Sequence, residues 1–316
     1  MTPVKLNVMF AFFPYGGTGG TAVEHPSIRR WFADTLLKAK ADERVGQVMT
    51  KDFSDTPITA TRNEAVLVAR ELKADVLVMC DSDQHPDVHL EADGVKPFWD
   101  SSFDFIYTNH AVGPMVVAAP YCGPPPGENI YVFRWANWET DTPNYDIRLE
   151  QFTREDACIR TGIEPVGALP TGLSMWDMRA FKLIEPCALS KKEILEKVYS
   201  REWTVKEAEL ALSEGFFYYE WTNMYAAKKA STEDVTATRD LSLIGQQLLN
   251  YNPVHVNWDA WAGHYKPKCV TKPKPLSISQ INAKYRDAVT RNNPVEEKMT
   301  FVRPEMLKAI AGNGKP

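Results

Sequence analysis

Two aspartates that follow a strongly apolar run are the first residues of this chain that could do chemistry. Asp81 and Asp83, with Ser82 between them, come directly after the run 76–80. Two carboxylates one residue apart can hold a hard divalent cation, Mn²⁺ or Mg²⁺, which in turn binds phosphate oxygens. The alternative is a turn with a helix N-cap, since Asp and Ser favour both. Because ligands of open α/β sheets bind outside the carboxyl ends of the strands, we interpret the pair as a metal site.

A second acidic pair, Glu233 and Asp234, begins a predicted helix and follows the aromatic stretch 216–221. Carboxylates in the first turn of a helix are stabilised by its dipole, so simple capping is the alternative. Flat apolar rings suit the face of a sugar, and a carboxylate beside them can take a proton from a hydroxyl. We therefore interpret Asp234 and Glu233 as the catalytic pair.

A histidine near the end of the aromatic stretch 258–266 is a third candidate. His264 could supply a nitrogen ligand to the same cation as the aspartates, and Lys266 could neutralise a phosphate. A lone histidine is more often structural, and His255 competes for the role. Gly263 indicates close approach of the backbone, which favours His264 as the ligand.

The glycine-rich stretch 16–20 suggests a phosphate loop but fits neither the Walker spacing nor the Gly-x-Gly-x-x-Gly fingerprint. We expect a mobile loop or lid near a nucleotide instead.

Alternating strands and helices must position these residues. Apolar runs bounded by turn residues predict strands, and apolar spacings of three and four predict helices, one of them opened by a capping-box pattern at Thr61 and Glu64. The strands are expected over 4–13, 75–80, 104–107 and 115–120, and the helices over 26–41, from 61 onward, and over 191–199, 205–213 and 231–249. This alternation predicts an α/β fold with a mostly parallel sheet.

Charge divides the chain into a body and a tail. The net charge is −5, yet residues 266–316 hold 11 of the 36 Lys and Arg residues and 4 of the 41 Asp and Glu residues. We expect one domain over 1–265, with a nucleotide-binding half 1–120 and an acceptor half 121–265, followed by a basic linker and helical extension over 266–316. The basic tail is expected to face an anion, although a solvated helical face explains its lysines equally well.

Composition excludes several classes of protein. With 44% hydrophobic and 24% charged residues, the chain is neither disordered, collagen-like nor a coiled coil. The five scattered cysteines form no Cys-x-x-Cys pair, which argues against a disulfide framework and indicates a reducing compartment. The N-terminal apolar run is too short for a signal peptide or membrane span, so we expect a cytoplasmic protein.

Five stretches, taken in order, resemble a family-two-like glycosyltransferase of the GT-A fold, of phage or bacterial type. The resemblance covers about residues 4–266. Within 166–175, Pro170 and Thr171 depart from the pattern of that family. The matching stretches are 61–65, 76–83, 166–175, 232–235 with Arg239 and Leu241, and 263–264.

The resemblance implies a nucleoside-diphosphate sugar as donor, with a UDP-sugar expected. Its diphosphate would be bridged by Mn²⁺ or Mg²⁺ to Asp81, Asp83 and His264. In an inverting enzyme Asp234 or Glu233 would deprotonate the acceptor hydroxyl, whereas a retaining enzyme needs no such base. The residues expected to contact the donor are Phe13, Pro14, Arg62, Asn63, Asp81, Ser82, Gly172 and Lys266.

The acceptor stays open at the level of sequence. The Pro-rich stretch 122–127, Trp135, Trp138 and the basic tail would suit stacking and phosphate contacts, so a hydroxylated base in phage DNA is one candidate. A pI near 5.8 argues against general nucleic-acid binding, and protein, lipid-linked and small glycan acceptors remain. The rival functions are a metal-dependent nucleotidyltransferase or phosphohydrolase and a non-catalytic nucleotide-sugar or glycan-binding protein.

Overall fold

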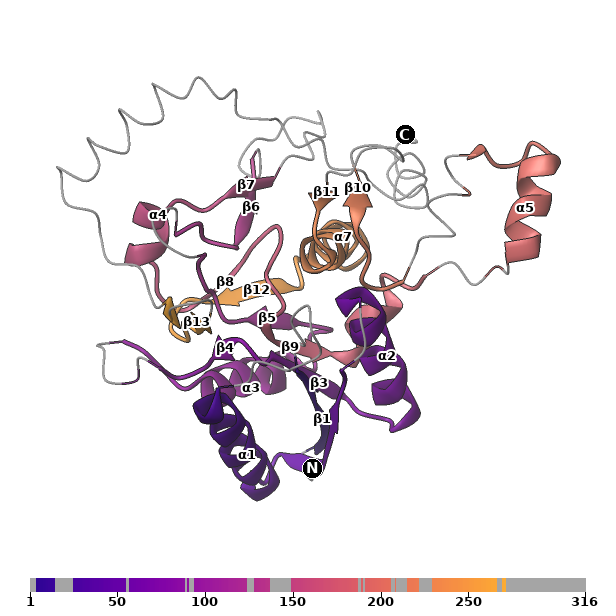
Figure 1. Ribbon diagram of the computed structural model, residues 1–316. Coiled ribbons are helices and arrows are strands. Elements are labelled where there is room, and N and C mark those ends of the chain that lie inside the picture. Colours follow the sequence, from indigo (N-terminus) through magenta and orange to yellow (C-terminus); the bar gives the residue numbers. More distant parts are fainter. Residues whose placement is uncertain are drawn as a thin grey trace, which may run out of the picture.

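The centre of the molecule is a seven-stranded sheet (Figure 1). A computed structural model describes residues 4–14, 25–54, 57–88, 90, 94–123, 128–136, 149–186, 189, 191–205, 208, 215–221, 229–265 and 269–270. The strand order is β2-β1-β3-β9-β5-β12-β8, and five strands share one direction while β9 and β8 run against them. The strands are β1 (Leu6–Phe13), β2 (Val45–Asp52), β3 (Val76–Asp81), β5 (Val116–Ala118), β8 (Ile163–Pro165), β9 (Leu173–Asp177) and β12 (Val254–Asn257).

Helices cover both faces of this sheet. Strand β1 shows why, since Met9 and Ala11 pack into one apolar core and Phe10 and Phe12 into the other. A strand whose alternate side chains are buried on both sides must be covered by elements on both sides. Helices α1 and α3 contribute to the second core, and α2 and α7 to the first. Their bounds are α1 (Pro26–Ala41), α2 (Ile58–Glu71), α3 (Phe98–Asn109) and α7 (Glu233–Leu249).

Short elements complete the described part of the chain. Strand β4 follows Asp83 directly and pairs with β13, which places His264 opposite Gln84. None of the helices in the described residues is both long and apolar enough to cross a membrane. The short elements are β4 (Gln84–His85), β6 (Phe133–Trp135), β7 (Leu149–Gln151), α4 (Arg154–Ile159), η1 (Met178–Lys182), α5 (Lys191–Tyr199), β10 (Glu220–Trp221), β11 (Lys229–Ser231), β13 (Gly263–Tyr265) and β14 (Cys269–Val270).

The predicted α/β class is confirmed: the chain has a mostly parallel sheet flanked by helices on both faces. The finer GT-A assignment stays a prediction. Strands from both 1–120 and 121–265 enter the same sheet, because β9 lies between β3 and β5. Apart from β14, the expected C-terminal extension lies outside the described residues. The glycine-rich stretch 16–20 lies outside them too, as does most of the helix expected over 205–213.

Two local predictions are wrong. Residues 104–107 belong to helix α3, whose Phe98, Ser102 and Ile106 are buried at helical spacing; a short apolar run does not separate strand from helix by itself. Thr61 does not cap α2, because that helix already begins at Ile58. The Thr61 hydroxyl instead donates a hydrogen bond to the Pro57 carbonyl at 3.1 Å.

His255 on β12 makes the stability of the fold depend on pH. Burial lowers the pKa of its imidazole from 6.5 to about 4. Below pH 6.5 the imidazole is protonated in the unfolded chain, but in the folded chain it stays neutral down to about pH 4. The free energy of unfolding therefore falls as the pH is lowered from 6.5 to 4. In a His255→Phe variant we expect the free energy of unfolding, measured by urea denaturation, to fall less between pH 7 and pH 4 than in the wild type. An equal fall in both proteins would contradict this role of His255.

Candidate functional site

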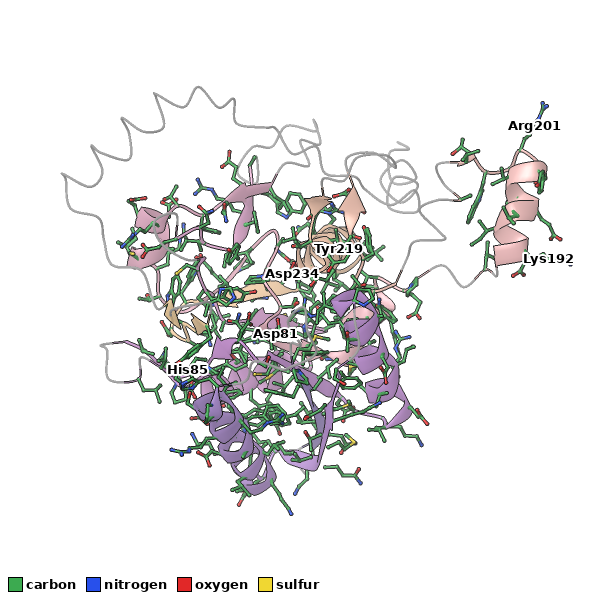
Figure 2. All side chains as sticks on the ribbon, viewed as in Figure 1. Asp81, His85, Lys192, Arg201, Tyr219 and Asp234 are labelled. Atoms are coloured by element: carbon green, nitrogen blue, oxygen red, sulfur yellow. The ribbon has the colours of Figure 1, made fainter. Side chains whose placement is uncertain are left out.

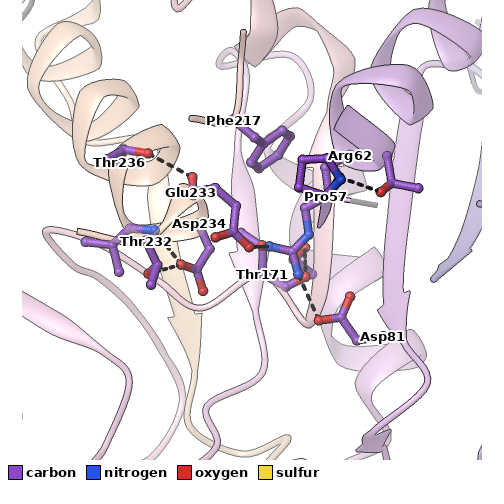
Figure 3. Close-up of polar contacts among 12 residues, drawn as sticks. Pro57, Arg62, Asp81, Thr171, Phe217, Thr232, Glu233, Asp234 and Thr236 are labelled. Carbon is purple, nitrogen blue, oxygen red and sulfur yellow. Dashed lines mark hydrogen bonds and ion pairs between the residues drawn. The ribbon is translucent and has the colours of Figure 1, made fainter. Parts of the chain in front are cut away.

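A buried arginine joins the two acidic pairs that the sequence singles out (Figure 3). Asp81 ends β3, Glu233 begins α7, and Arg62 lies on α2 between them. The Arg62 Nη2 atom lies 2.8 Å from Asp81 Oδ2, and Nη1 lies 2.8 Å from Glu233 Oε1. The Arg62 side chain is only 3% exposed. The predicted metal pair and the predicted catalytic pair therefore belong to one site.

This site carries a surplus of negative charge. Burial raises the pKa of both Asp81 and Glu233, while the charge of Arg62 acts in the opposite direction. Asp83 and Asp234 are near enough to raise the pKa of Asp81 further. In the described part of the site, four carboxylates thus lie near a single guanidinium, which contacts two of them, Asp81 and Glu233. A cation bound here would relieve that repulsion.

His264 has the orientation of a metal-ligating histidine. Its Nδ1 donates to the Cys122 carbonyl at 3.2 Å, which leaves the lone pair on Nε2. That Nε2 lies 3.4 Å from Asp83 Oδ2. Two atoms that both carry lone pairs face each other, and either a proton or a metal ion between them makes the arrangement favourable. A ring N–H bound to a carbonyl is the usual support of a metal ligand.

Asp81 supplies a second observation that fits a cation. Its Oδ1 atom is buried and has no hydrogen-bond partner among the described residues. Its other oxygen, Oδ2, binds Arg62. Among the described residues, no three His, Cys, Asp or Glu side chains lie close enough together to form a metal-binding group. Oxygen and imidazole donors suit Mn²⁺ or Mg²⁺. The donor types of Asp81, Asp83 and His264 thus suit a divalent cation, although the structure does not bring the three together as a metal-binding group.

Asp234 differs from its neighbour Glu233. It is half-buried, whereas Glu233 is buried and paired with Arg62. Asp234 Oδ1 accepts hydrogen bonds from the Thr232 hydroxyl and from the Val235 amide. Thr232 is the N-cap residue of α7, but its side chain caps no backbone amide there. Asp234 is thus the more accessible carboxylate of the pair.

Tyr121 is a site residue that the sequence interpretation missed. Its ring centroid lies 4.9 Å from that of His264. Burial and the negative charges of Asp234 and Asp81 raise the pKa of Tyr121 well above 10. The phenol therefore stays neutral and able to donate. Its position just past β5, at the edge where Asp81 also lies, is the only sequence signal that could have found it.

The predicted donor contacts divide into two groups. Phe13 and Gly172 lie at the site through their backbones, since the Phe13 carbonyl accepts from Ser82 N at 3.0 Å and the Gly172 carbonyl from Asp81 N at 2.7 Å. Pro14 follows Phe13, is half-buried, and ends the described part of that segment. Asn63 instead holds the backbone of Phe217, donating to its carbonyl and accepting from its amide.

Other expected residues lie away from the site or outside the described chain. Trp135 is buried, and its Nε1 donates to Ser242 Oγ at 3.0 Å, so the expectation that it stacks on an acceptor is wrong. His255 packs against Phe105 on α3, away from the aspartates. Lys266 and Trp138 lie outside the described residues.

A second buried ionic cluster lies further along α7. The Arg239 guanidinium binds Glu220 Oε2 at 2.9 Å and Asp240 Oδ1 at 2.8 Å. The Tyr218 hydroxyl donates to Asp240 Oδ2 at 2.8 Å. Glu220 comes from β10, so this cluster ties that strand to the helix that carries Glu233 and Asp234.

Comparison with known proteins shows only distant similarity. No protein-family model matches the chain, and no curated protein is similar to it in sequence. Among solved structures, the crystal structure of A197 from STIV is similar with 15% identity and a TM-score of 0.41, over 86% of this chain and 97% of that one. GalNAc-T7, crystallised with UDP, GalNAc and Mn²⁺, is similar with 13% identity and a TM-score of 0.38, over 83% of this chain and 44% of that one. At such scores neither structure carries an argument about this chain.

Proposed function

We propose that this protein is a metal-dependent glycosyltransferase that moves a sugar from a nucleoside-diphosphate sugar to an acceptor hydroxyl. The observation that carries the proposal is the surplus of carboxylates around Arg62, with His264 Nε2 facing Asp83. Such a site attracts a divalent cation, and a divalent cation attracts a diphosphate. The resemblance to family-two-like enzymes of phage or bacterial type supports the same assignment.

Asp81, Asp83 and His264 would hold Mn²⁺ or Mg²⁺ in this proposal. When bound, the cation supplies positive charge that stabilises the leaving nucleoside diphosphate. The Cys122 carbonyl keeps His264 in the tautomer that presents Nε2 to the cation. The backbone near Phe13 and Gly172 lines the donor site, and Lys266 is a further candidate for contact with a phosphate.

Asp234 is the proposed base. It would take the proton of the acceptor hydroxyl as that oxygen bonds to the anomeric carbon and the bond from that carbon to the diphosphate oxygen breaks. Hydrogen bonds from Thr232 and Val235 fix its carboxylate. Glu233, held by Arg62 at 2.8 Å, would position the first turn of α7 rather than accept the proton. This base is needed only if the enzyme inverts the configuration of the anomeric carbon; a retaining enzyme would stay active without it.

DNA with a hydroxylated base is one proposed acceptor, with protein, lipid-linked and small glycan acceptors as the others. The support for DNA is the basic composition of 266–316. Binding of the full chain to duplex DNA should then weaken steeply as salt rises. No binding at low ionic strength would remove this acceptor and leave the others.

The proposed function is tested by a thermal-shift panel of nucleoside diphosphates and sugar nucleotides, each with and without Mn²⁺. We expect one nucleotide to raise the melting temperature only when the metal is present, because a ligand that binds the folded state stabilises it. Incubation with the matching sugar nucleotide should release nucleoside diphosphate. Release of pyrophosphate would indicate a nucleotidyltransferase instead, and stabilisation without any turnover would indicate a binding protein.

A further inference from the structure

Three polar side-chain atoms beside Asp81 are buried without a hydrogen-bond partner among the described residues. They are Thr171 Oγ1, Gln84 Oε1 and Arg62 Nε. Thr171 is 0% exposed, Gln84 1% and Arg62 3%. Burying an unpaired polar group costs free energy, so most such groups in native proteins are paired. These three unpaired groups are therefore where a ligand atom would gain most from hydrogen bonding.

Gly172 lies close to Asp81 and to Gln84. Gln84 Cδ and Asp81 Oδ2 each lie 3.1 Å from the point that a Cβ on residue 172 would occupy. Thr171 precedes this glycine, whose carbonyl accepts from Asp81 N. Figure 3 shows Thr171 beside the Arg62 guanidinium, between Glu233 and Asp81. The unpaired atoms therefore border the proposed metal site, on the side of Arg62.

The chemistry of the three atoms selects the ligand group. Gln84 Oε1 only accepts, Arg62 Nε only donates, and the Thr171 hydroxyl does both. A phosphate oxygen without a proton cannot satisfy Gln84, and a cation cannot satisfy Arg62. A hydroxyl group donates once and accepts twice, which matches this set.

We propose that Thr171 and Gln84 bind a hydroxyl of the transferred sugar and select sugars that carry it. The inference rests on the proposed function, because the sugar of a nucleotide donor would lie next to the cation at Asp81. A site built to pair with a buried hydroxyl rejects an analogue that lacks it, since its own polar groups then stay unpaired. Thr171, a departure from the family-two pattern, thus becomes a specificity residue of this chain.

The test compares Thr171→Val with the wild-type protein on UDP-glucose, UDP-galactose and their monodeoxy analogues, with Mn²⁺ present. We expect the wild type to lose about tenfold or more in kcat/KM on one deoxy analogue. The kcat/KM of the variant should be about tenfold lower than that of the wild type on the parent sugar, and should not fall further on that deoxy analogue. The Kd of UDP, measured by calorimetry, should stay within about twofold, because UDP lacks the sugar. Gln84→Met should lower the same preference.

Stability of the ligand-free protein separates this role from a structural one. Valine in place of an unpaired buried hydroxyl should keep or raise the melting temperature. Ser102→Ala is the matched control, since the buried Ser102 hydroxyl accepts a hydrogen bond from Asn257 at 3.0 Å and lies on α3. It should lower the melting temperature and leave sugar preference unchanged.

The two proposals fail in different ways. If the wild type turns over a sugar nucleotide but Thr171→Val keeps the same preference among deoxy analogues, the hydroxyl subsite is overturned and the function stands. The atoms would then hold an internal water. If the wild type binds no nucleotide with Mn²⁺, the proposed function is overturned and the subsite with it.

Discussion

Replacing both Asp81 and Asp83 with asparagine is expected to abolish Mn²⁺-dependent binding of nucleoside diphosphate and to lower turnover by about a thousandfold or more. The amides keep the shape of the side chains but remove two of the four negative charges that attract the cation. Arg62 keeps its partner Glu233 at 2.8 Å, so the variant should fold. Calorimetric titration with Mn²⁺ and UDP, followed by donor hydrolysis, measures both effects.

The control removes the same two charges elsewhere. Asp34 and Asp100 are exposed residues of α1 and α3, and Asp34→Asn with Asp100→Asn should leave binding and turnover unchanged. Metal-dependent binding that persists in the Asp81 and Asp83 variant would contradict the proposed cation site. Binding lost equally in the control would show a general effect of net charge instead.

Arg239→Met is expected to lower the free energy of unfolding by about 3–5 kcal/mol. The side chain is 0% exposed and is paired with Glu220 and Asp240. Methionine fills similar space but leaves two buried carboxylates with no cation between them. Equilibrium denaturation in urea measures the loss, and a loss below about 1 kcal/mol would contradict a buried ionic role.

Two further variants sharpen this result. Arg30→Met changes an exposed arginine of α1 and should alter stability by less than about 0.5 kcal/mol. Adding Glu220→Gln and Asp240→Asn to Arg239→Met removes the uncompensated charges and should recover much of the loss. Failure of these additions to restore stability would mean that packing of the Arg239 side chain, and not charge, is what the protein loses.

The sequence predicts the local elements that carry the site better than it predicts the contacts between them. The continuous apolar run before Asp81 predicts a buried strand, and β3 confirms it with five buried residues. Pro26–Ala41 likewise forms the expected helix. These features depend on residues near one another in the chain, where periodicity carries information.

Long-range contacts explain what the sequence could not predict. Arg62 and Glu233 are 171 positions apart, and no local pattern says that one guanidinium will bind both acidic pairs. Tyr121 has no flanking motif, and Thr171 is visible only as a departure from a family pattern. Their roles depend on the order of strands, because β9 brings residues 171–172 against the end of β3.

The reversed direction of β9 also separates the site from the segment that leads to α5. Leu173 pairs with Cys80 beside the aspartates, but Asp177 pairs with Val76 at the opposite end of β3. The chain therefore leaves the sheet at the remote edge before it reaches α5. Figure 2 shows Lys192 and Arg201 on that arm, far to one side of Asp81 and Asp234. We therefore expect changes in the length of that segment to leave the geometry of the proposed site unaltered.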